Sequence, residues 1–142
     1  MKKIIKVAVC GGFDPLHIGH IEYLEKARQL GDKLIVILNN DNWLMKKKGF
    51  CFMNEKERKK ILESLKFVDE VVLTGHQMNP EDMSTCETLK RIKPDILAKG
   101  GDKNRDNIPE TKLCDELGIK IVDGLGEKIQ SSSTLLKKMM EK

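Results

Sequence analysis

A glycine pair followed by two histidines stands near the start of the chain, in the decapeptide Gly11–His20 (GGFDPLHIGH). Glycines allow a backbone to come close to a phosphate, and a helix beginning after them offers free N–H groups and a partial positive charge. His17 and His20 are three residues apart, so they share one face of such a helix. There they can donate hydrogen bonds to phosphoryl oxygens as charge develops in a transition state. The alternatives are a surface histidine pair and a metal site; the latter is disfavoured because only one other histidine, His76, exists.

Four further segments carry groups that suit a phosphorylated ligand, and each also has an ordinary structural explanation. Lysine triplets occur in solvated loops, an adjacent Glu and Arg occur on exposed helices, glycine pairs form tight turns, and hydroxyl side chains cap helices. The segments are Lys46 to Lys48, Glu57 with Arg58, Lys99 to Asp102, and Gln130 to Thr134.

Short apolar runs alternate with amphipathic segments along the chain, a pattern typical of a parallel sheet covered by helices on both faces. We therefore expect an α/β fold: a Rossmann-like, doubly wound, five-stranded parallel sheet in a single domain, residues 1–142. Long irregular stretches are expected over 39–53 and 100–108, after strands, where ligands bind in such sheets. The expected strands are 4–10, 33–39, 68–73, 95–99 and 119–122, and the expected helices are 18–30, 54–65 (capped by Asn54 and Glu57), 81–92, 109–117 and 132–140.

Composition narrows the classes of function. The 142 residues are 39% hydrophobic and only 4% aromatic, which argues against global disorder and against a stacking surface for single strands. Residues 1–60 carry 13 basic and 7 acidic residues, and residues 61–142 carry 13 and 15, so the N-terminal half suits an anionic small molecule while the acidic second half disfavours a nucleic acid. No apolar run approaches the roughly 20 residues that span a bilayer. Four cysteines without a Cys-x-x-Cys pair indicate free thiols in the cytoplasm, with Cys10 and Cys114 in the core.

The Gly11–His20 segment resembles the Gly-x-Phe-Asp-x-x-His-x-Gly-His motif of the nucleotidyltransferase superfamily that includes glycerol-3-phosphate cytidylyltransferase and the adenylyltransferase domain of the ADP-heptose synthases. The resemblance covers essentially the whole chain, and the four later segments follow in the family's order. It implies catalytic roles for His17, His20 and Lys46, with Lys47 or Lys48 as substitutes for Lys46. It implies nucleotide contacts from Gly11, Gly12, Phe13, Asp14, Arg58, Lys99, Gly100, Asp102, Ser131, Ser132 and Ser133.

The implied reaction is the transfer of a nucleoside monophosphate from a triphosphate to a phosphorylated small acceptor, such as a sugar or polyol phosphate, with release of pyrophosphate. Mg²⁺ is expected to bind with the triphosphate, and a homodimer is expected from the family. The Lys-Gly-Gly-Asp segment favours ATP, and so does Gly126, which stands where glycerol-phosphate cytidylyltransferases carry arginine; CTP is the alternative. A non-catalytic nucleotide-binding module and a basic nucleic-acid-binding domain are the rival interpretations.

Overall fold

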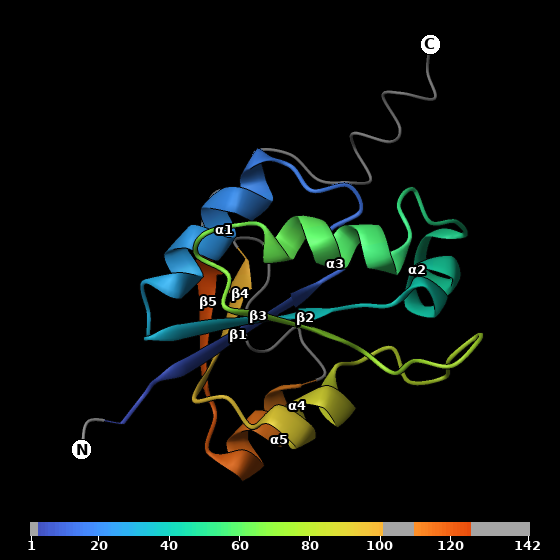
Figure 1. Ribbon diagram of the computed structural model, residues 1–142. Helices are drawn as coiled ribbons and strands as arrows, with labels where there is room; N and C mark the ends of the chain where they lie inside the picture. Colours follow the sequence, from blue (N-terminus) through green and yellow to red (C-terminus); the bar gives the residue numbers. More distant parts are fainter. Residues whose placement is uncertain (1–2, 101–109, 126–142) are drawn as a thin grey trace.

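The computed structural model describes residues 3–100 and 110–125, and its centre is a sheet of five parallel strands (Figure 1). Apolar runs of β-branched residues and leucine form the strands, and the central ones are buried on both faces, as expected for a parallel sheet. The strands lie in the order β3-β2-β1-β4-β5. Their bounds are β1 (Lys6–Gly11), β2 (Lys33–Leu38), β3 (Glu70–Leu73), β4 (Ile96–Gly100) and β5 (Lys120–Leu125).

Helices cover both faces of this sheet. In Figure 1, α1 (Ile18–Arg28) and α3 (Glu55–Glu63) lie on one side, and α4 (Cys86–Ile92) and α5 (Thr111–Leu117) lie on the other. Each side has its own core: Leu24 and Leu62 pack against the first face, and Leu89 and Cys114 pack against the second. The predicted Rossmann-like, doubly wound α/β fold is therefore confirmed.

The prediction of an irregular stretch over 39–53 is wrong, because residues Asp41–Lys48 form a helix, α2. Asn40 caps this helix by accepting a hydrogen bond from the N–H of Trp43, and Gly49 ends it in the left-handed conformation, with a φ of 84°. Only Leu44 is buried in α2, so the segment lacks the apolar periodicity that reveals an amphipathic helix. The helix lies at the edge of the sheet where the strands end (Figure 1).

The other expected elements occur with shifted ends. The expected helix over 81–92 begins only at Cys86, because residues 75–85 form a loop. Asn54 accepts a hydrogen bond from the N–H of Glu57 as expected, but Glu57 accepts from the side-chain amide of Asn54, not from its backbone. Helix α5 ends at Leu117, the last residue of the expected helix over 109–117, and Gly118 follows it with a φ of 73°. The expected helix over 132–140 lies outside the described residues.

Two further expectations concern the cysteines and the membrane. Cys114 is fully buried, whereas Cys10 is only half-buried beside the same core. None of the helices in the described ranges combines the length and the apolar content needed to cross a bilayer.

Candidate active site

The two histidines of the glycine-rich turn form the start of α1. His17 is the N-cap residue, and its Nδ1 accepts a hydrogen bond from the N–H of Gly19 at 3.1 Å. In return, Nδ1 of His20 accepts from the N–H of His17 at 3.2 Å. The two rings stack with their centroids 3.8 Å apart. This reciprocal capping fixes the orientation of both imidazoles, since each satisfies an N–H group that a helix start leaves free.

Because each Nδ1 accepts a hydrogen bond, a neutral ring carries its hydrogen on Nε2. Nε2 of His17 is buried and has no hydrogen-bond partner. Burial lowers the pKa of His17, and the positive charge of Lys48 lowers it further. Burial, the neighbouring His17 and Lys48 together lower the pKa of His20 to about 3. The pair therefore consists of uncharged N–H donors at physiological pH, one of which lacks an acceptor.

The residues between β1 and α1 hold this pair in place. Phe13 has a φ of 48°, an unfavourable backbone conformation for a bulky side chain, and its buried ring packs edge-on against His20 at 4.9 Å. Asp14 is fully buried, and its carboxylate accepts hydrogen bonds of 2.7 Å from the N–H groups of Phe52 and Met53. Both predicted nucleotide-binding side chains thus make protein contacts: Phe13 supports an imidazole, and Asp14 ties the turn to the segment after α2.

Gly12 is needed at its position because α2 packs directly over it. A Cβ atom added to Gly12 would lie 2.9 Å from Cδ2 of Leu44. Such a distance is shorter than a van der Waals contact allows. Gly11 is also close-packed, since a Cβ there would lie 3.2 Å from the ring of Phe13. The glycine pair therefore brings α2 and the Phe13 ring close to the end of β1.

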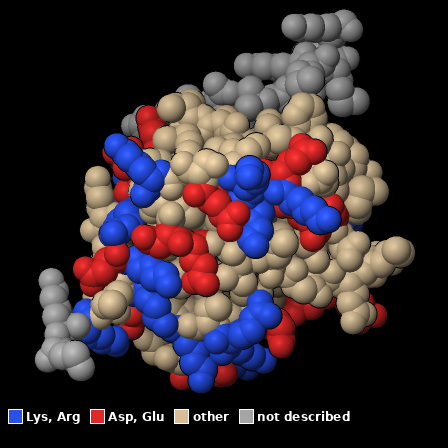
Figure 2. All heavy atoms as spheres, in the orientation of Figure 1, with Lys and Arg blue, Asp and Glu red and all other residues tan. Residues whose placement is uncertain are grey.

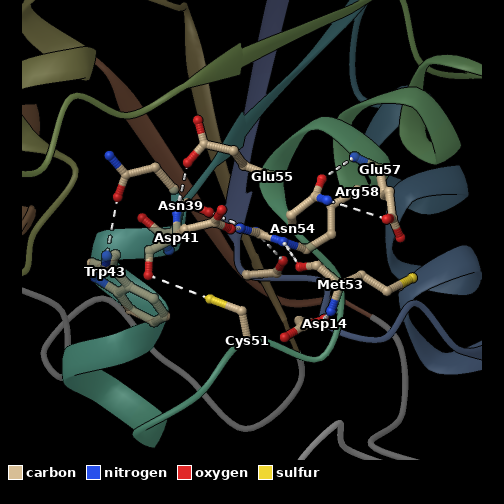
Figure 3. A network of polar contacts seen from close by, with 12 residues as sticks. Asp14, Asn39, Asp41, Trp43, Cys51, Met53, Asn54, Glu55, Glu57 and Arg58 are labelled. Carbon is tan, nitrogen blue, oxygen red and sulfur yellow. Dashed lines mark hydrogen bonds and ion pairs between the residues drawn. The ribbon is translucent and has the colours of Figure 1, made fainter.

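Arg58 is the centre of the polar network drawn in Figure 3. Its side chain is 1% exposed. The guanidinium donates to the carbonyl oxygens of Gly12, Asn39 and Met53 and pairs with the carboxylate of Asp41 at 2.7 Å. This one side chain therefore joins four segments of the chain: the glycine turn, the end of β2, the start of α2 and the start of α3. Arg58 positions the site, and its contacts are with the protein.

The three lysines at the end of α2 have different surroundings. The ammonium group of Lys46 donates to the carbonyl of Pro80, in the loop after β3. Lys47 is exposed. Lys48 is half-buried, and its charge acts on both histidines. The pKa of Lys48 is lowered overall. Burial is the largest cause, the carboxylate of Asp14 opposes it, and the positive charge of Arg58 adds to it. Of the three, Lys48 is the lysine that the structure brings to the histidine pair.

The Lys99–Asp102 segment is divided by the limit of the described residues. Lys99 turns into the protein, with its ammonium 3.1 Å from Sγ of Cys10. Gly100 ends β4, and a Cβ there would meet no atom within 4 Å. Asp102 and the three predicted phosphate-binding residues Ser131, Ser132 and Ser133 lie outside the described residues.

One site feature escaped the sequence-based predictions. The side-chain oxygen of Asn39 is buried without a partner, at the end of β2, although its backbone N–H and carbonyl are bonded to Gly11 and Arg58. An unpaired buried acceptor costs about 1–3 kcal/mol unless a ligand satisfies it. The signal available in the sequence was only its place directly after a strand. In the described parts of the chain, no cluster of three or more His, Cys, Asp or Glu side chains could hold a metal ion.

Comparisons with known proteins identify the family of this chain. The cytidylyltransferase-like family matches residues 8–138. The FAD synthase of Pyrococcus abyssi is 38% identical over 82% of this chain and 76% of its own length. The bifunctional protein HldE of Aliarcobacter butzleri is 39% identical over 99% of this chain, which spans only 27% of that longer protein.

A solved structure gives the same result for the fold. The crystal structure of a lipopolysaccharide core biosynthesis protein from Thermoplasma volcanium superimposes with a TM-score of 0.72 at 30% identity, covering 88% of this chain and 99% of that one. Since sequence and fold agree over most of its length, the chain belongs to the cytidylyltransferase-like family and is a nucleotidyltransferase.

Proposed function

We propose that this protein transfers AMP from ATP to the phosphate group of a small acceptor and releases pyrophosphate. An oxygen of the acceptor phosphate attacks the α-phosphorus of ATP, and the bond between that phosphorus and the bridging oxygen of the β-phosphate breaks. The observation that carries the proposal is the histidine pair, which presents locked, uncharged Nε2–H donors at a helix start. Donors of this kind act where negative charge develops in the transition state.

Each part of the site has a role in this scheme. His17 and His20 donate to oxygens of the α-phosphate, and Lys48 supplies the positive charge that the two neutral imidazoles lack. We thus assign to Lys48 the catalytic role expected for Lys46, whose ammonium is engaged by Pro80. Arg58, Phe13 and Asp14 position these groups. Ser131, Ser132 and Ser133 are proposed to hold the departing pyrophosphate, with Gly11, Gly12, Lys99, Gly100 and Asp102 near the nucleotide.

Mg²⁺ is proposed to arrive with the triphosphate. The residues fit this arrangement, because Mg²⁺ in such sites is held by substrate phosphates with one or two carboxylates at most. Both oxygens of the Asp14 carboxylate already accept backbone hydrogen bonds, so Asp102 is the carboxylate that we propose for it. When bound, the ion neutralises phosphate charge.

The choice of ATP rests on the relatives named FAD synthase, because FAD consists of AMP joined to the phosphate of FMN. FMN is therefore the first acceptor to test, and sugar or polyol phosphates are the second class. Two half-exposed aromatic side chains, Phe50 and Phe52, lie in the segment that Asp14 holds beside the histidine turn, and they favour a flat aromatic acceptor.

The homodimer and the single catalytic domain 1–142 stay predictions.

The test is a matrix of donors and acceptors read by pyrophosphate release. ATP and CTP are each combined with FMN, a heptose phosphate, glycerol 3-phosphate and no acceptor, in the presence of Mg²⁺. We expect release with ATP and one acceptor, and a loss of about 10²–10³-fold in kcat for His20→Ala. Nucleotide binding without release in any combination would contradict the proposal and favour a non-catalytic module. Release with CTP alone would overturn the choice of ATP.

A further inference from the structure

The side chain of Lys99 is buried, and the proposed nucleotide transfer does not explain its contacts. Its side chain is 6% exposed, and none of the ion pairs among the described residues includes it. A buried ammonium is costly unless nearby groups compensate its charge, and Glu110, itself buried, acts on Lys99 without forming an ion pair with it. Within residues 3–100 and 110–125, its ammonium group donates a hydrogen bond to a sulfur atom, Sγ of Cys10, at 3.1 Å.

Cys10 receives two donors on its sulfur. Besides the ammonium of Lys99, the hydroxyl of Thr85 points to Sγ at 3.9 Å, a weaker contact. Cys10 belongs to β1, Lys99 to β4 and Thr85 is the N-cap residue of α4, so three separate elements converge on this atom. Cys10 is also half-buried, in contrast to the fully buried Cys114.

Electrostatics tie the lysine to the cysteine. Burial lowers the pKa of Lys99, but Cys10 and Glu110 outweigh that effect, so the pKa of Lys99 is raised and the side chain stays charged. A thiolate is the nucleophilic form of a cysteine, and a cation in contact with the sulfur stabilises it. The Lys99 ammonium lies 3.1 Å from Sγ of Cys10, and Lys99 is little exposed. Solvent therefore screens the attraction between the two groups only weakly.

Cys51 provides the contrast within the same chain. It is half-buried like Cys10, but its Sγ donates to the carbonyl of Asp41. Burial and the Asp41 carboxylate raise the pKa of Cys51. Cys114 is fully buried, and burial and Glu110 raise its pKa to about 11. Cys10 and Cys51, both half-buried, thus have opposite hydrogen-bond roles: Sγ of Cys51 donates to a carbonyl, whereas Sγ of Cys10 accepts from an ammonium group.

We propose that Cys10, paired with Lys99, is a site of covalent modification by peroxides. In this step Sγ attacks one oxygen of hydrogen peroxide, the O–O bond breaks, and an S–O bond forms. The sulfur is oxidised by two electrons to a sulfenic acid, and the peroxide is reduced. The proton of the thiol ends on the departing hydroxide as water, so atoms and electrons balance, and Lys99 keeps its charge throughout.

The experiment measures sulfenic acid formation at each cysteine of the reduced protein. The protein is exposed to limiting hydrogen peroxide with dimedone as the trap, and peptide mass spectrometry gives the initial rate for Cys10 and for Cys51. We expect Cys10 to react at least about tenfold faster than Cys51. Equal rates would overturn the proposal, and this comparison needs no variant.

The Lys99→Met variant tests the role of the cation. We expect the rate at Cys10 to fall about tenfold while the rate at Cys51 stays constant. Lys90→Met, at an exposed position of α4, is the matched control and should leave both rates unchanged. Lys99→Arg, which keeps the charge, should restore part of the rate. An unchanged Cys10 rate in folded Lys99→Met would show that the lysine does not activate the thiol. None of these readouts depends on nucleotide transfer, so they can succeed where the proposed function fails.

Discussion

At the scale of single residues, the division of labour between imidazole and ammonium is the central feature of the site. Reciprocal capping of α1 orients His17 and His20. Burial and the charge of Lys48 lower the pKa of both rings, so neither brings a positive charge. Lys48 supplies that charge from the end of α2. Neutral donors suit a position close to the reacting phosphorus, because they bind developing charge without repelling each other.

The lysine assignment gives the first prediction, tested by changing each member of the triplet to methionine. We expect Lys48→Met to lower kcat by about 10²-fold, since a group acting on transition-state charge is lost. Lys47→Met is the control and should retain activity, because Lys47 is exposed. Lys46→Met should affect activity mainly by removing the hydrogen bond between Lys46 and the carbonyl of Pro80. Initial rates of pyrophosphate release measure all three; a Lys46→Met loss larger than that of Lys48→Met would return the role to Lys46.

The second prediction concerns pH and stability. The pKa of His20 falls from an ordinary value of 6.5 to about 3 on folding, so the unfolded chain binds a proton more readily than the folded one. The stability contributed by this ring is complete above pH 6.5 and is lost as the pH falls from 6.5 toward 3. Urea unfolding of the wild type and His20→Asn at several pH values measures this. The free energy of unfolding should fall more steeply with acid in the wild type; parallel slopes would contradict the pKa assignment.

At the scale of elements, sequence patterns predicted the buried strands. They missed helix α2 and the directions in which its lysines and Arg58 point. The strands were predictable because they contain continuously apolar runs such as Leu34–Leu38. Helix α2 was missed because a single buried leucine leaves no periodicity. Lys46 and Lys48 could not be distinguished without knowing that they are in a helix. Residues that are two positions apart in a helix point in directions that differ by about 200°. Arg58 was expected to touch nucleotide, because sequence alone does not tell whether a helical arginine faces inward.

The packing of α2 over the glycine turn gives the third prediction. Gly12→Ala places a Cβ 2.9 Å from Leu44, so we expect a loss of about 1–3 kcal/mol in the free energy of unfolding. Gly75→Ala is the control, because a Cβ there meets nothing within 4 Å. A second substitution, Leu44→Ala, removes the clashing atoms. The double variant should therefore be more stable than the sum of the two single losses indicates, and additive losses would contradict the contact.

At the scale of the whole molecule, charge is distributed in a way that suits a small anionic ligand. In the face shown in Figure 2, lysines and arginines are interspersed with aspartates and glutamates, without a continuous basic surface. The positive charge that matters is local, at Lys48 beside the histidine pair. A nucleic-acid-binding domain would instead neutralise many phosphates along an extended surface, and its affinity would fall steeply with salt.

The fourth prediction separates these two kinds of ligand by the stability that each adds. A ligand that binds only the folded chain stabilises it by RT ln(1 + [L]/Kd), or about 2.7 kcal/mol at one hundred times Kd. We expect ATP with Mg²⁺ to raise the melting temperature of the wild type, and a duplex DNA of equal phosphate concentration to leave it unchanged. Lys48→Met should lose much of the ATP effect, whereas Lys47→Met should keep it. A shift produced by DNA and abolished by moderate salt would instead point to a nucleic-acid partner, because only an extended polyanion releases many counterions when it binds.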